Sequence, residues 1–237
     1  MTDQSSPQQP SGGGSSGAGG GTVQHDPIVA AFMAILAEKR FEDIGFAEIA
    51  RRAGVSLSEL RLKHASKIEM LAASMRDVDR AVLDGIDSGL ADEPPRERLF
   101  DVLMRRLDIL AADKAAVKSL RQSATFNPGL ALAVNGLATR SMQWMLTAAD
   151  ITATGPKGMV RAQGLALLFA SVLRTWLHDD DPGQARTLAA LDRALSSGQR
   201  WAGLLDDLCR IPEAACSARR AFSRRRQDDR GKESAAA

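Results

Sequence analysis

The sequence predicts an all-α protein, and three observations support this. Apolar residues recur at intervals of three and four along most of the chain, which is the spacing of one helix face. Several segments start with a capping residue followed by proline, as at 26–27, 127–128 and 181–182, and this pairing typically opens a helix. No segment shows a strong alternation of apolar and polar residues, so strands are not expected.

Composition divides the chain into four parts. Residues 1–22 are rich in Gly, Ser, Gln and Pro and are expected to form a disordered arm. Residues 24–90 are expected to form a small domain with a connecting helix, and residues 94–210 a larger helical domain. The boundary falls at Pro94 and Pro95, since proline opens a helix but does not continue one. Residues 211–237 are basic and are expected to be a disordered tail.

The small domain is expected to contain four helices. The first runs from Asp26-Pro27 to near Arg40, and the second covers 46–54. A third, short helix starts at Ser56, and the longest runs over 66–89 with apolar residues every three or four positions. This order places two short helices between two longer ones.

The larger domain is expected to continue as a helical bundle. Its helices are predicted from about 96 onward, then over 115–124, 128–149, 155–178, 182–197 and 199–210. The segment 159–177 is apolar nearly all round, so it is either a core helix or a helix shared with a second subunit. We favour the second interpretation, a homodimer interface built with helix 182–197.

The segment FAEIARRAGVSLSEL, residues 46–60, has the features of a helix-turn-helix. Gly54 can adopt the positive φ that stops one helix and turns the chain. Ser56 and Glu59 have the spacing of a capping box, and Ala50 and Ala53 are small enough for two helices to cross closely. In this motif the second helix enters the major groove of DNA.

Residues 28–71 resemble the N-terminal domain of TetR/AcrR-type transcriptional regulators. EIARRAGVSLSEL is followed in register by SKIEML, matching the helix-turn-helix and the start of the next helix. The resemblance implies a cytoplasmic homodimer that binds a palindromic site in double-stranded DNA. It implies phosphate contacts near Ser56 and Lys67 and groove contacts from Ser58, Arg61 and Lys63. The DNA-binding candidates are Arg51, Arg52, Ser56, Ser58, Arg61, Lys63, His64 and Lys67.

The short helix also departs from that pattern. Arg61, Lys63 and His64 stand where the family usually has aromatic residues, and Leu57 cannot hydrogen-bond a base, although it can touch a thymine methyl. Residues 24–72 hold 7 Lys and Arg against 7 Asp and Glu. The alternative interpretation is therefore that these side chains are ordinary solvated charges.

The larger domain is similar to the accessory lipid-binding family of ubiquinone biosynthesis, which shares the TetR fold. The similarity lies in RERLFDVLMRRLDIL, NPGLALAV and RAQGLALLFASVLRTWLHDD. It implies an isoprenoid lipid as ligand and no repressor activity, whereas a regulator would take a small apolar ligand. The ligand-binding candidates are Phe100, Met104, Trp144, Met145, Phe169 and Trp176.

Other functions have less support in the sequence. No nucleophile motif or phosphate loop is present, so we expect no enzyme, no cofactor and no metal. His178 and Asp181 are explained as helix-end residues. The predicted helix 199–210 and the Arg-rich tail suggest peripheral membrane contact or contact with DNA phosphates, and the alternative is a docked helix with a solvated tail.

Overall fold

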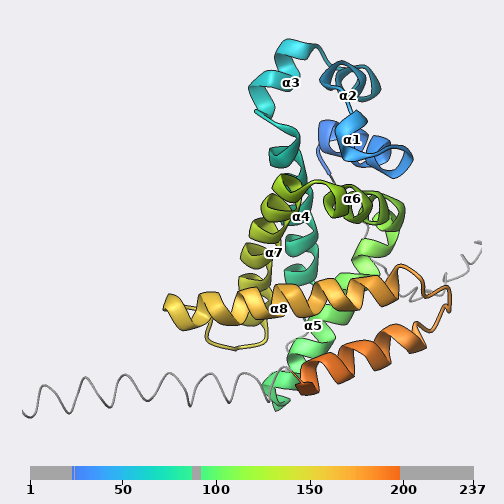
Figure 1. Cartoon of the computed structure of the whole chain (residues 1–237). Helices are drawn as coiled ribbons and strands as arrows, with labels where there is room; N and C mark the ends of the chain where they lie inside the picture. Colours follow the sequence, from blue (N-terminus) through green and yellow to red (C-terminus); the bar gives the residue numbers. More distant parts are fainter. Residues whose placement is uncertain (1–22, 24, 87–91, 198–237) are drawn as a thin grey trace, which may run out of the picture.

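The computed structural model describes residues 23, 25–86 and 92–197, and every regular element in these ranges is helical. Five elements form the part at the top of Figure 1, which we call the head. They are α1 (Pro27–Glu38), the 3-10 helix η1 (Phe41–Asp43), α2 (Phe46–Ala53), α3 (Leu57–Lys63) and α4 (Lys67–Asp84). Only the upper half of its last helix belongs to the head. The prediction of an all-α fold is confirmed.

The helices of the head begin and end where local chemistry requires. The Asp26 side chain accepts a hydrogen bond from the Ile28 N–H at 2.9 Å and caps α1. Ser66 caps α4 in the same way, through a 3.1 Å bond from the Glu69 N–H. The long helix α4 ends at Asp84, five residues earlier than the periodicity predicts.

The remaining elements form the body, which comprises the helices below the head in Figure 1. They are α5 (Pro95–Leu110), η3 (Ala111–Asp113), α6 (Lys114–Phe126), α7 (Pro128–Ala148), α8 (Gly155–Trp176) and a last helical stretch over 185–197. In Figure 1, α8 lies across α5, and α4 stands beside α7.

The last helical stretch starts three residues later than the predicted 182. The Asp181 side chain precedes this stretch and accepts hydrogen bonds from the Gly183 and Ala185 N–H groups at 3.2 and 3.3 Å. The predicted helix over 199–210 and the Arg-rich tail lie outside the described residues, as do the N-terminal arm 1–22 and residues 87–91.

Two hydrophobic cores hold the fold, and neither follows the domain boundary expected from the sequence. The head core contains Phe32, Ile49 and Leu60, but it also contains Ala116 and Leu120 of the body helix α6. Backbone groups of the head bond to α6 as well: Ser123 Oγ accepts from the Phe41 N–H at 3.0 Å. The head is therefore completed by α6 and is not closed by its own helices.

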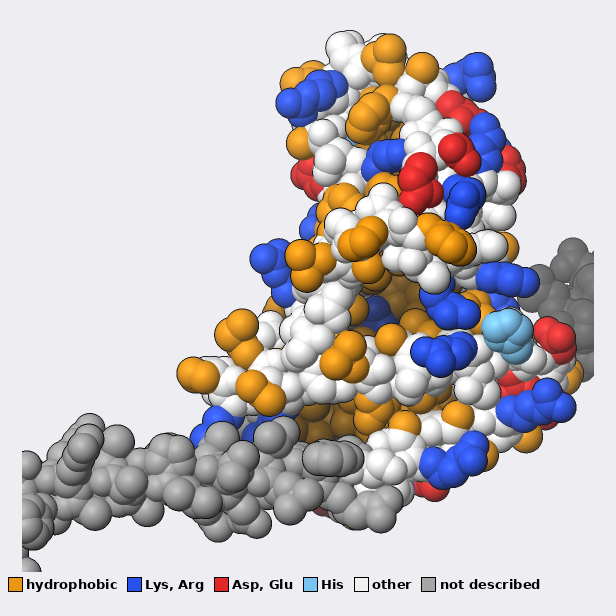
Figure 2. Space-filling view, viewed as in Figure 1, with side chains coloured by type: hydrophobic (Ala, Val, Ile, Leu, Met, Phe, Trp, Pro, Cys, Tyr) orange, Lys and Arg blue, Asp and Glu red, His pale blue; other side chains and the backbone are white. Residues whose placement is uncertain are grey.

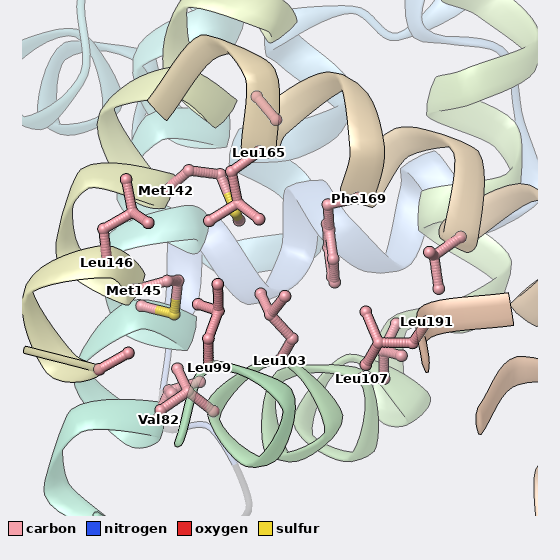
Figure 3. Packing of buried hydrophobic residues seen from close by; sticks show 14 of the residues in the cluster. Val82, Leu99, Leu103, Leu107, Met142, Met145, Leu146, Leu165, Phe169 and Leu191 are labelled. Atoms are coloured by element: carbon pink, nitrogen blue, oxygen red, sulfur yellow. The ribbon is translucent and has the colours of Figure 1, made fainter. Parts of the chain in front are cut away.

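The body core lies between α4, α5, α7 and α8. Figure 3 shows Leu99, Leu103 and Leu107 on α5 pointing toward Leu165 and Phe169 on α8. Met142 and Met145 fill the space on the α7 side. Because Val78 and Val82 of α4 belong to this core, α4 connects the two cores as one continuous helix.

Candidate nucleic-acid interface

The turn between α2 and α3 has the backbone that its sequence predicts. Gly54 adopts the left-handed conformation with φ 70°, and the Val55 N–H bonds to the Ala50 carbonyl at 3.0 Å. Ser56 Oγ then accepts from the Glu59 N–H at 3.1 Å and caps α3. Buried Ile49 and Leu60 hold the two helices together in the head core.

The buried position of Leu60 fixes which residues of α3 face outward. Each residue of a helix turns by about 100°, so Ser58 and Leu62 lie farthest from Leu60, about 160° to either side. Leu57 and Arg61 lie together on one flank, and Glu59 and Lys63 lie on the other. Leu62 is 87% exposed and Leu57 is 54% exposed, whereas Leu60 is 3% exposed.

The basic candidates differ in how far they are already paired. Arg52 makes a two-pronged ion pair with Glu38, with N–O distances of 2.7 and 2.9 Å. Lys63 lies 3.6 Å from an oxygen of Asp26 and 3.8 Å from one of Glu59. Within the described residues, the exposed guanidinium groups of Arg51 and Arg61 have no hydrogen-bond or ion-pair partner.

This pairing explains how a head with no net charge can leave the cations Arg51 and Arg61 unpaired among the described residues. The acids Glu38 and Glu48 of α1 and α2 pair with Arg52 and Lys39, whereas α3 carries a single acid, Glu59. In Figure 2 orange and blue side chains form the uppermost edge of the head, and most red side chains lie below that edge.

The expected phosphate contact from Lys67 is not supported. Its ammonium group donates to the carbonyl oxygens of Phe41 and Ile44 at 2.7 and 3.0 Å and lies 4.6 Å from the centre of the Phe41 ring. Burial lowers the pKa of Lys67, and the nearby Glu42 and Asp43 oppose that shift. Lys67 therefore ties α4 to the carbonyl groups around η1.

Two other candidates also contribute to local structure. Ser56 Oγ lies 2.9 Å from Ser58 Oγ in addition to capping α3, so one of the two hydroxyls donates to the other. His64 ends α3 and is half-buried, in an open cleft of about 440 Å³ between α3 and α4. Its Nδ1 is buried without a hydrogen-bond partner among the described residues.

A polar cluster that the sequence analysis missed joins the head to the body. His25 Nδ1 lies 2.9 Å from Asp77 Oδ2 on α4, and Nε2 lies 3.5 Å from Asp113 Oδ2 on η3. The hydrogen bond with Asp113, followed by that with Asp77, raises the pKa of His25 against the opposing effect of burial. The partners lie 52 and 88 residues from His25, so no local spacing in the sequence indicates them.

A second missed group is buried inside the body. Arg106 of α5 is 3% exposed and pairs with Asp79 of α4, whose Oδ1 also accepts from Ser141 Oγ of α7 at 2.6 Å. The Arg106 guanidinium lies 5.8 Å from the centre of the Phe169 ring. This group fixes three helices to one another.

Five of the six ligand-binding candidates lie together in the body, and one does not. Met145, Phe169 and Trp176 belong to the body core, and Phe100 and Met104 pack against it. Trp144 is 57% exposed on α7 and is not part of this core, so its role in ligand binding stays a prediction. Figure 2 shows a hollow with mostly hydrophobic walls between α6 and α8.

Chemistry other than binding has little support here. The described residues contain no group of three side chains suited to hold a metal ion. Asp179, the second residue of the segment HDDDP, accepts two hydrogen bonds from Thr187, at 2.9 Å from its N–H and 2.7 Å from its hydroxyl. These bonds lower the pKa of Asp179, the Thr187 hydroxyl contributing most. None of the helices in the described ranges has the length and hydropathy needed to cross a membrane.

Comparison with known proteins identifies the fold. The sequence matches no protein-family model and no curated protein. The structure resembles that of a TetR transcriptional regulator from Nitrosomonas europaea, with 23% identity and a TM-score of 0.57 over 73% of this chain and 96% of that one. It also resembles a TetR-family transcriptional regulator from Streptomyces coelicolor, with 14% identity and a TM-score of 0.51 over 76% and 82% of the two chains. The chain therefore has the TetR fold.

The similarity to the ubiquinone accessory family stays a prediction, because no family model matches. At these identities the solved structures show a shared fold alone. What the protein does must be argued from its own side chains.

Proposed function

We propose that this protein is a transcriptional regulator that binds double-stranded DNA as a homodimer, with α3 of each subunit in the major groove of one half-site. The observation that carries the proposal is the outward face of α3, which has no covering element among the described residues. Arg61 on that face and Arg51 at the end of α2 are exposed and unpaired within the described part of the chain. Two such heads would bind a palindrome if their α3 helices lie about 34–36 Å apart, one turn of DNA.

The test is the salt dependence of DNA binding. Fluorescence anisotropy with the full chain and a duplex should show an affinity that falls as salt rises, with a slope of about −0.9 per phosphate contact. Because the head is neutral overall, we expect few such contacts and a shallow slope. Replacing Arg51 and Arg61 by alanine should remove most of that slope. Arg193→Ala, an exposed arginine on the last helical stretch, should leave the slope unchanged.

The homodimer is supported by apolar side chains on the outside of the body. Met159, Val160 and Leu167 on α8 are 62, 56 and 59% exposed, and Trp144 on α7 is 57% exposed. Complete burial of a large apolar side chain is worth about 1.5–3 kcal/mol, and a dimer interface would gain the part of this that is still exposed. Sedimentation velocity should give a dimer for the wild type and a monomer for Leu167→Glu. A wild-type monomer at micromolar concentration would refute this part of the proposal.

We propose that a small apolar ligand binds in the body and shifts the spacing of the two heads. The hollow between α6 and α8 and the apolar side chains of the body core support this, and α6 packs against the head as well. A ligand there could act on the heads only by its different affinity for two dimer geometries. Native mass spectrometry of the purified protein tests for a bound lipid or other apolar molecule.

A further inference from the structure

The outward face of α3 is more apolar than DNA phosphates require. Leu62 is 87% exposed and lies on the side of α3 opposite the buried Leu60. Leu57 is 54% exposed and lies beside Arg61 on one flank of the helix. Single exposed leucines are common on protein surfaces and need no explanation. Here two of the six exposed residues of one seven-residue helix are leucines, and this helix is the one proposed to enter the groove.

Few polar groups on this face are available to read bases. The hydroxyl of Ser58 is bonded to that of Ser56 at 2.9 Å. Lys63 lies on the opposite flank, near the carboxylates of Asp26 and Glu59. Arg61 is left as the strong hydrogen-bond donor of the face, and arginine pairs best with O6 and N7 of guanine.

We propose that Leu57 and Leu62 recognise thymine by contacting its 5-methyl group, on either side of a guanine bound by Arg61. This inference rests on the proposed function. Thymine presents a methyl group in the major groove, whereas a leucine can satisfy none of the donors and acceptors on the other base edges. Contact between leucine and the methyl group removes apolar surface of both from water.

The dimensions of α3 fit this arrangement. An α-helix with its side chains is about 10–12 Å across, and the major groove is about 12 Å wide, so α3 can lie in it. Leu57 and Leu62 are five residues apart, or about 7.5 Å along the helix axis. When α3 follows the groove, with about 3.4 Å between successive base pairs, the two methyl groups should lie up to about two base pairs apart.

The experiment begins with duplexes selected from a random pool by the full-length wild-type protein. Each thymine of the best duplex is then replaced in turn by uracil, which removes the methyl group and keeps every hydrogen-bonding group. We expect two positions per half-site at which uracil weakens wild-type binding by about threefold to fivefold, the change expected for one methyl-sized apolar group.

Variants assign each position to a side chain. At one of the two thymine positions, replacement by uracil should no longer weaken the binding of Leu62→Ala. At the other position, it should no longer weaken the binding of Leu57→Ala. Leu132→Ala, which removes a leucine 74% exposed on α7, should keep the wild-type response at both. Because all three leucines are exposed, the variants should fold, and thermal melting checks this.

The outcomes separate the two proposals. If no duplex is enriched by the wild type, the proposed function is wrong and this inference falls with it. If a duplex is bound but uracil replacement changes nothing, DNA binding stands and methyl recognition is wrong. The inference is also wrong if Leu62→Ala weakens binding to the thymine and uracil duplexes by the same factor.

Discussion

Replacement of Arg106 by methionine should destabilise the body strongly. The wild-type guanidinium is 3% exposed, and it neutralises Asp79, which is itself 8% exposed. Without Arg106 the Asp79 carboxylate keeps the hydrogen bond from Ser141 Oγ at 2.6 Å but loses its cation. Breaking one partner of a buried ion pair costs about 3–5 kcal/mol, because the other charge is left unpaired. Methionine keeps an apolar chain at this position but also loses the contacts of the guanidinium with Met145 Sδ and the Phe169 ring.

Urea denaturation followed by circular dichroism measures this loss, at one protein concentration because association adds to apparent stability. Arg193→Met removes an exposed arginine and should change the free energy of unfolding by less than about 0.5 kcal/mol. The double variant Asp79→Leu with Arg106→Met removes both charges, and it should be more stable than Arg106→Met alone. A loss below about 1 kcal/mol for Arg106→Met, or simple additivity in the double variant, would refute the reasoning.

Three further predictions concern the head and its junction with the body. Gly54→Ala should lower the free energy of unfolding by about 1 kcal/mol, because alanine is disfavoured at the φ of 70° found there. No neighbouring atom would clash with the added Cβ, so the cost is purely conformational. A loss above about 3 kcal/mol in thermal melts would contradict this. His25→Gln should cost about 1 kcal/mol at acidic pH, where the imidazolium donates to both carboxylates. Since the folded pKa of His25 is raised, its contribution is complete below the ordinary pKa of about 6.5 and is lost as pH rises through the folded value; a stability difference that grows from pH 6 to 9 would exclude this mechanism. Lys67→Met should lower the melting temperature and leave the salt dependence of DNA binding unchanged. A changed salt dependence would show that Lys67 contacts a DNA phosphate after all.

Much of the candidate site follows from local sequence. The Gly54 turn, the Ser56 cap and the burial of Leu60 are set by neighbours within about four residues, and each was predicted or follows from the helical period. The outward position of Leu62, about 200° after Leu60, follows from the same period, although Leu62 was not among the DNA-binding candidates. Which of the basic side chains remain unpaired could not be predicted in this way.

The sequence by itself determined the helices and most of their ends, because capping residues, prolines and apolar spacing act over one or two turns; the end of α4 and the start of the last helical stretch were misplaced. Only the tertiary structure decided that Lys67 turns inward, that α6 completes the head core and that Trp144 stays outside. Each depends on which helices pack together: α6 reaches the head across more than 80 residues of chain, as in the bond between Phe41 and Ser123. The period of a helix tells which face is apolar, but the partner that covers that face is chosen by the packing of the whole chain.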